Sequence, residues 1–388
     1  MNYFSSNFKL GILGGGQLGK MLLFETRKFD IYTKVLDPSI DAPSKIACNE
    51  FVQGDLMDFD TVYQFGKQVD VLTFEIELVN ILALEQLEAE GILVYPSSKT
   101  LKYIQNKGVQ KDFYVQNNIP TAAFRRFDNL TILKELAKNQ NISLPFIWKS
   151  AEFGYDGNGV KMIRAIKDLD SLPNVACIAE DVVDFEKELA VIVCRNAAGN
   201  FKTYPVVEME FHPEANQVEY VICPANIKAE ISKKAIDIAL MLAQKMDVVG
   251  LLAVEMFLTA DESILVNEVA PRPHNSGHFS IEASFTSQFE NHIRAVLNLP
   301  LGCCDSKLPA VMVNLVGETG FAGNVIYENM EKILSLDGVC PHIYGKMQTR
   351  AFRKMGHVTI VNQDAARARL IAAEVKLMLR VVGDVDLS

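Results

Sequence analysis

Two apolar segments, each carrying one glutamate, are followed by a stiff polar tail, and this stretch decides the fold. The first segment is Val254-Glu255-Met256-Phe257. The second segment and its tail read Leu265-Val266-Asn267-Glu268-Val269-Ala270-Pro271-Arg272-Pro273-His274-Asn275-Ser276-Gly277-His278. Apolar residues alternate with polar ones around Glu255, and residues 259–263 have the composition of a turn. The pattern therefore predicts a β-hairpin.

Two glutamates among Val, Leu and Met side chains need a partner, because a lone buried carboxylate is costly. Glu255 and Glu268 offer the carboxylate oxygens that Mg²⁺ prefers, and water and phosphate oxygens would complete its octahedron. In the tail, Pro271 and Pro273 fix φ on both sides of Arg272. The simpler alternative is a buried strand pair with one salt bridge between Glu268 and Arg272.

Composition excludes several classes of protein. The chain has 388 residues, a net charge of −10 and seven scattered cysteines. This length allows two or three domains, and the acidic balance argues against a nucleic-acid surface. The most apolar region, residues 236–257, is interrupted by charged residues, so no membrane span is expected. The cysteine pattern and the absence of a secretory signal shape suggest reduced thiols in a cytoplasm.

The first hundred residues have the pattern of a Rossmann-like half. A short apolar strand at residues 9–13 leads into Gly14-Gly15-Gly16-Gln17-Leu18-Gly19 and an apolar helix. This matches the G-x-G-x-x-G turn, with Asp37 near the end of the next strand. Further alternation of strands and helices predicts a parallel sheet. Glu75 follows its third strand, where ligands usually bind, although a solvated loop carboxylate is the alternative.

The middle of the chain has the pattern of a small lid. Residues 99–118 predict one polar-faced helix whose lysines are mostly solvated. Strands at 145–149 and 160–163 then flank a loop, residues 152–159, with three glycines. Its N–H groups can close over phosphates, which Lys149 can reach as a point charge, although a plain hairpin loop is the alternative. After the next strand, residues 180–183 could offer backbone groups to an adenine edge and Glu188 could bind a ribose.

The last third of the chain contains two predicted helices, at residues 227–246 and 285–297, and a strand at 311–316. A looser region is expected as far as residue 344. Residues 364–381 then predict a surface helix that is followed by a short tail.

This order of elements resembles the ATP-grasp enzymes, and among them the carboxyaminoimidazole ribonucleotide synthetase family. The motifs run from residue 9 to residue 357, and the string from Asn267 to His278 is the most specific. The resemblance implies a mixed α/β and α+β ATP-grasp fold. It has a Rossmann-like pre-ATP-grasp domain at residues 1–110, a lid at 111–192 and a larger C-terminal domain at 193–388.

The resemblance also implies roles for individual residues. Those for ATP are Lys107, Lys149, Gly154, Tyr155, Asp156, Gly157, Asn158, Gly159, Val160, Glu180, Asp181, Val182, Val183, Glu188, His212, Asn267 and Glu268. Those for catalysis are Arg272, His274, Asn275, Tyr155 and Asp156. Those for the ribonucleotide are Gly16, Gln17, Leu18, Glu75, Lys346 and Arg353. Those for the metal are Glu255, Glu268 and Asn267.

The implied activity is carboxylation of 5-aminoimidazole ribonucleotide with ATP and bicarbonate, in purine biosynthesis, with Mg²⁺ (or Mn²⁺) and by a homodimer. Two positions depart from the family pattern. Asn158 stands in the flap where relatives often carry a cation, and Phe211-His212 stands where one aligned histidine is usual. The competing hypotheses are an NAD-dependent oxidoreductase that uses residues 14–19, a formate- or amine-specific ATP-grasp ligase, and a non-enzymatic nucleotide sensor.

Overall fold

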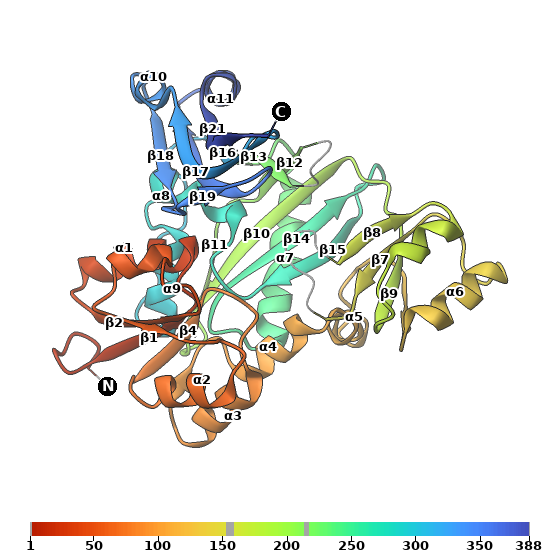
Figure 1. Ribbon diagram of the computed structural model, residues 1–388, viewed down its shortest axis with the longest axis horizontal. Helices are drawn as coiled ribbons and strands as arrows, with labels where there is room; N and C mark the ends of the chain where they lie inside the picture. The colour runs from red at the N-terminus through yellow and green to blue at the C-terminus, as the bar shows by residue number, and fades with distance from the viewer. Residues whose placement is uncertain (1, 153–158, 213–216, 388) are drawn as a thin grey trace.

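The computed structural model describes residues 2–152, 159–212 and 217–387. Four sheets are arranged along the chain, and Figure 1 shows the N-terminal sheet, the lid and the C-terminal part around a long central sheet. Among the described residues, no helix is both long and apolar enough to cross a membrane. All seven cysteines are free thiols, as their scattered positions predicted.

The N-terminal part is a parallel sheet with the order β3-β2-β1-β4-β5 and helices around it. This confirms the predicted alternation of strands and helices. Its elements are β1 (Lys9–Leu13), α1 (Gln17–Lys28), β2 (Tyr32–Asp37), η1 (Pro43–Ile46), β3 (Glu50–Gln53), α2 (Phe59–Gly66), β4 (Val71–Phe74), α3 (Ile81–Ala89) and β5 (Leu93–Val94).

Two short helices, α4 (Ser98–Gln105) and α5 (Lys107–Gln116), replace the single helix expected at residues 99–118. Asn106 separates them because its backbone is extended and its side chain caps α5 by accepting from Val109 N at 3.0 Å. The prediction of one helix was therefore wrong.

The lid is a four-stranded antiparallel sheet with the order β6-β9-β7-β8. Its elements are β6 (Phe124–Phe127), α6 (Leu130–Lys138), β7 (Phe146–Ser150), β8 (Val160–Ile163), η2 (Ile166–Ser171) and β9 (Cys177–Asp181). The next strand, β10 (Lys187–Arg195), pairs instead with β14 (Gly250–Leu258) in the central sheet. The lid sheet thus ends before the expected boundary at residue 192.

The central sheet has nine strands, and its two faces differ in character. Odd-numbered residues of β10, such as Leu189 and Val191, share one apolar cluster with α7 (Ala229–Lys245). Even-numbered residues, such as Ala190 and Ile192, share another cluster with Phe279 on the opposite face. Because side chains alternate along a strand, this second face is the one toward which Glu188 and Glu255 point. The polar site therefore shares its face of the sheet with the second apolar cluster.

The remaining elements of the central region are β11 (Phe201–Thr203), β12 (Val207–Phe211), β13 (Val218–Cys223), β15 (Ile264–Ala270), η3 (Asn275–Gly277), α8 (Ser280–Ala283), α9 (Gln288–Val296) and β16 (Ala310–Val316). The C-terminal part follows with β17 (Phe321–Glu328), α10 (Met330–Leu334), β18 (Val339–Ile343), β19 (Gln348–Thr349), β20 (Lys354–Val361), α11 (Ala365–Met378) and β21 (Arg380–Asp386).

Two expectations for this C-terminal part were wrong. The region as far as residue 344 is ordered as β17, α10 and β18. The expected tail after α11 is strand β21, which pairs antiparallel with β17 in a small sheet of its own. Its pairing partner lies far away in sequence, which is why local pattern did not reveal the strand.

Candidate active site

The predicted hairpin is present, and it brings its two glutamates together. Strands β14 and β15 pair antiparallel with Glu255 directly opposite Glu268. A bulge follows Glu255, so that Met256 pairs with Val266 and Asn267 is the extra residue of β15. Directly opposite residues of an antiparallel pair point to the same face. Both carboxylates therefore lie on one face of the sheet, and Asn267 is placed beside them by the bulge.

Glu188 adds a third carboxylate to this face. Ala190 of β10 lies opposite Glu255, and Glu188 is two residues along the same strand. Burial raises the pKa of Glu255 to about 8, and repulsion from Glu268 and Glu188 adds to the effect. Burial also raises the pKa of Glu188 to about 7, again with repulsion from Glu268. The three acids therefore disfavour one another's charge, and a bound cation would relieve this repulsion and favour their ionised forms.

Lysines from outside the central sheet approach these acids. Lys107, at the start of α5, places its Nζ 2.7 Å from Glu268 Oε2. The attraction of Lys107 lowers the pKa of Glu268, which stays ionised. Lys149, in β7 of the lid, donates to Asn267 Oδ1 at 3.1 Å. The hairpin and the lid thus meet through a mixed set of acids, amide and ammonium groups.

Lys111 was expected to be solvated, and the structure corrects this. Its side chain is 3% exposed, and its Nζ lies 2.8 Å from Glu180 Oε1. The second oxygen of Glu180 lies 2.8 Å from Lys149 Nζ, so one carboxylate joins the two lysines. Burial disfavours the charge of Glu180, but Lys149 and Lys111 lower its pKa overall. Glu180 was predicted near the nucleotide, whereas Lys111 was missed.

The tail of the hairpin is held by partners that the sequence did not indicate. Arg272 Nε lies 2.7 Å from Glu77 Oε1, so the alternative of a salt bridge to Glu268 is wrong. Asn275 exchanges two hydrogen bonds with the amide of buried Asn314, at 2.8 and 2.9 Å. His274 Nε2 lies 3.3 Å from Glu255 Oε1, while its Nδ1 lies 2.9 Å from a serine hydroxyl. These contacts fix the orientation of all three side chains and place His274 beside the acid pair.

The glycine loop of the N-terminal sheet is occupied by the chain's own carboxylates. Gly15 N donates to Asp37 Oδ2 at 2.7 Å, and Gly16 N donates to Glu75 Oε1 at 2.7 Å. The alternative that Glu75 is solvated is wrong, because its exposure is only 7%. Burial raises the pKa of Glu75 to about 7, and the Gly16 N–H and Arg272 partly oppose that rise. An NAD pyrophosphate would have to compete for the same N–H groups.

Other predicted residues lie at the edges of this region. Leu18 is buried in the core, so any ligand contact from it would be through its backbone. Lys346 Nζ donates to Lys354 O at 2.8 Å, and Arg353 Nη1 donates to Gln348 O at 2.6 Å. The ring of His212, just after β12, packs edge-on against Phe352, next to Arg353, with centroids 5.8 Å apart.

The flap residues Gly154, Tyr155, Asp156, Gly157 and Asn158 lie outside the described residues. At its end, Gly159 has φ +81° and Val160 opens β8 opposite Lys149. Asp181 ends β9, and Val182 and Val183 follow that strand; Asp181 and Val182 are exposed. Of the described residues, no group of three or more His, Cys, Asp or Glu is arranged to hold a metal by itself. A cation at the acid pair would need ligands from a nucleotide or from water.

Comparisons with known proteins give a consistent result along the chain. Three family models match it: the ribonucleotide synthetase preATP-grasp domain at residues 8–105, the ATP-grasp domain at 112–289, and the phosphoribosylaminoimidazole carboxylase C-terminal domain at 310–370. N5-carboxyaminoimidazole ribonucleotide synthase of Bacillus subtilis is 36% identical, with 91% of each chain covered. Phosphoribosylaminoimidazole carboxylase of Vigna aconitifolia, a chloroplastic protein, is 37% identical, and the match covers 91% of this chain but only 64% of that longer protein.

Solved structures agree with the sequence relatives. The N5-carboxyaminoimidazole ribonucleotide synthetase of Thermotoga maritima superposes with a TM-score of 0.89 at 41% identity, covering 97% of this chain and 100% of that one. The Aspergillus clavatus synthase in complex with ADP and 5-aminoimidazole ribonucleotide has a TM-score of 0.86 at 33% identity, covering 95% and 98%.

Proposed function

Because the chain belongs to the N5-carboxyaminoimidazole ribonucleotide synthase family of ATP-grasp enzymes, we propose that it carboxylates the exocyclic amine of 5-aminoimidazole ribonucleotide, using ATP and bicarbonate. The reaction belongs to purine biosynthesis. The observation that carries the proposal is the placement of Glu255 opposite Glu268, with Lys107 and Lys149 reaching the same hairpin. Two carboxylates and two lysine ammonium groups in that arrangement suit a nucleoside triphosphate with its metal ion.

Glu255, Glu268 and the amide oxygen of Asn267 are the groups that would hold Mg²⁺, with Mn²⁺ as the alternative. They fit a hard cation because all are oxygen donors and because the neighbouring acids repel one another without one. A cation held by these groups would supply positive charge to offset the negative charge that develops during phosphoryl transfer. Lys107 and Lys149 already contact two of these groups, the carboxylate of Glu268 and the amide oxygen of Asn267. Nucleotide binding would therefore redistribute these contacts.

The lysines bind and orient the phosphates. Lys149 carries its charge on the lid, next to the flap, and Lys107 carries its charge at the start of α5. In the proposed reaction the terminal phosphoryl group passes to an oxygen of bicarbonate, giving ADP and carboxyphosphate. Carboxyphosphate reacts readily with water, so its formation requires that the lid exclude solvent.

The second half of the reaction takes place on the side of Glu75 and Arg272. The amine nitrogen attacks the carboxyl carbon, phosphate leaves, and the nitrogen loses one proton. Glu75 has a pKa of about 7 and can accept a hydrogen bond from the amine when ionised. Arg272 is fixed by Glu77 and two prolines, so its guanidinium can orient bicarbonate or the carboxyl group. His274 is a candidate for accepting the proton.

The proposal is tested by phosphate release from ATP with each co-substrate omitted in turn, together with ¹³C-bicarbonate as a label. Turnover that requires both bicarbonate and the ribonucleotide, with label in an acid-labile carbamate, supports the proposal. Turnover with formate in place of bicarbonate would instead favour the formate-specific ligase. Glu268→Gln should abolish turnover, and full activity in this variant would refute the metal assignment. Light scattering after gel filtration tests the homodimer, which is part of the same proposal.

A further inference from the structure

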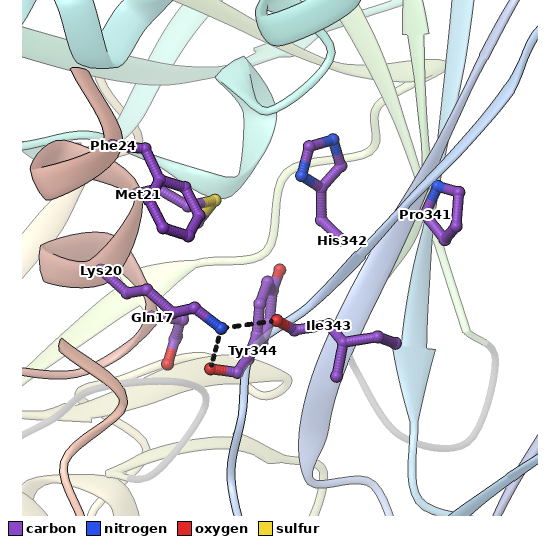
Figure 2. A pocket seen from close by; sticks show the side chains of 8 residues that line it. All are labelled: Gln17, Lys20, Met21, Phe24, Pro341, His342, Ile343 and Tyr344. Carbon is purple, nitrogen blue, oxygen red and sulfur yellow. Dashed lines mark hydrogen bonds between the residues drawn. The ribbon is translucent and has the colours of Figure 1, made fainter. Parts of the chain in front are cut away.

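Lys20 joins two parts of the chain that are more than three hundred residues apart. It lies in α1, and its Nζ donates to Ile343 O at 3.1 Å and to Tyr344 O at 3.3 Å. A cavity of about 210 Å³ lies between α1 and the end of β18, and Lys20 is one of the residues that line it. Figure 2 shows the Lys20 side chain reaching the two carbonyls. Burial lowers the pKa of Lys20. The ammonium group therefore connects the N-terminal sheet to the C-terminal part through backbone acceptors.

The two carbonyls immediately precede the segment that carries Lys346. Gly345 lies between Tyr344 and Lys346, and its φ of +89° is a left-handed conformation that favours glycine. A Cβ at this position would lie 3.3 Å from Lys20 Nζ, so the ammonium packs directly against the turn. The turn is thus defined by Lys20 on one side and by its own backbone conformation on the other.

Lys346 depends on this turn for its position. Its Nζ lies 5.7 Å from the centroid of the Tyr344 ring and donates to the carbonyl of Lys354. The Tyr344 ring is itself buried, with its hydroxyl 3.2 Å from His357 Nδ1. A shift of the backbone at residues 343–344 would therefore move the ammonium of Lys346 as well.

The other end of the link is the glycine loop. Lys20 lies within the first turn of α1, and its N–H donates to Gly16 O, the same residue whose N–H binds Glu75. Gln17 opens the helix and lines the same cavity as Lys20. Lys20 thus fixes the distance between the glycine loop, where Gly16 contacts Glu75, and the turn that carries Lys346. The two ends of one ribonucleotide would be held at these two places.

We infer that Lys20 is a positioning residue for the ribonucleotide: it holds the 343–346 turn against α1 so that Lys346 faces the phosphate of a substrate bound at the glycine loop. This inference rests on the proposed function, because that function names the substrate. It assigns no direct substrate contact to Lys20. Its removal should weaken ribonucleotide binding and leave the nucleotide half of the site unchanged.

The test compares Lys20→Met, which keeps the length of the side chain and removes the ammonium, with Lys45→Met. Lys45 is an exposed lysine of the same sheet region that also donates to a carbonyl, Ile40 O at 3.2 Å, but within its own segment. We expect the KM for the ribonucleotide to rise on the order of 10- to 100-fold in Lys20→Met, since small displacements of binding groups have effects of this size. The KM for ATP should change less than about twofold, and Lys20→Arg should restore most of the loss.

The outcomes separate this inference from the function on which it rests. A wild-type enzyme without ribonucleotide-dependent turnover would refute the proposed function. Wild-type turnover of the expected kind, with an unchanged KM for the ribonucleotide in Lys20→Met, would refute the positioning role alone. An equal rise in both KM values would also refute it. Gly345→Ala, which crowds the ammonium while keeping Lys20, is the second variant, and it should raise the same KM selectively; an unchanged KM there contradicts the inference.

Discussion

Replacement of Glu75 by glutamine should stabilise the protein at high pH. Glu75 is 7% exposed, and burial raises the pKa of its carboxyl from 4.5 to about 7. Between these two pH values the folded state binds more protons than the unfolded state, so this group lowers stability as the pH rises. At about 1.4 kcal/mol per pKa unit, the raised pKa lowers the free energy of unfolding, relative to low pH, by about 3 kcal/mol at pH 8 and by about 1 kcal/mol at pH 5.

Glutamine keeps an acceptor for the Gly16 N–H and carries no charge. We therefore expect Glu75→Gln to exceed the wild type in free energy of unfolding by about 2 kcal/mol more at pH 8 than at pH 5. Urea denaturation of both proteins at the two pH values measures the difference. Glu90→Gln is the control: hydrogen bonds from Gln86 and Tyr63 lower the pKa of this exposed carboxyl, so its small effect should have the opposite sign. A difference for Glu75→Gln that does not change with pH would refute the reasoning.

Three further substitutions test other parts of the site. Lys111→Met should lower the free energy of unfolding by about 3 kcal/mol, because it leaves the buried carboxylate of Glu180 with one lysine, and it should raise the KM for ATP. Thermal unfolding and steady-state kinetics measure the two effects, and the surface variant Lys102→Met should show neither. Arg353→Ala should raise the KM for the ribonucleotide at least about tenfold more than that for ATP, and equal changes would contradict its phosphate role. Gly277→Ala should cost about 2 kcal/mol in a urea titration, because its Cβ would collide with side-chain atoms of neighbouring residues, and wild-type stability would contradict this.

Sequence could predict the parts of the fold that depend on local pattern. Alternating apolar residues and turn residues suffice to predict β14, β15 and their pairing, because a hairpin is set by neighbours in the chain. The parallel N-terminal sheet follows from its regular strand and helix pattern in the same way. The break between α4 and α5 was also readable, since Asn106 is a favoured N-cap residue and Gly108 is a weak helix former.

The rest depends on contacts between distant segments. Lys111 lies on a helix with many polar residues, and only the packing of β9 against α5 reveals that it is buried with Glu180. Asn314 lies in an apolar strand, and its pairing with Asn275 requires the fold of the whole central sheet. Strand β21 had no local partner and was therefore expected to be a tail. Sequence reasoning named most of the side chains around the acid pair, whereas it missed the residues that hold them in place.

The most direct test of the central claim is Mn²⁺ binding, measured by electron paramagnetic resonance in the presence of a non-hydrolysable ATP analogue. The wild type and Arg353→Ala, which lies on the ribonucleotide side, should immobilise Mn²⁺ equally. Glu255→Gln and Glu268→Gln should each weaken its binding at least about tenfold, because each removes one charged ligand oxygen group. Wild-type Mn²⁺ binding in both glutamine variants would mean that the hairpin does not hold the metal.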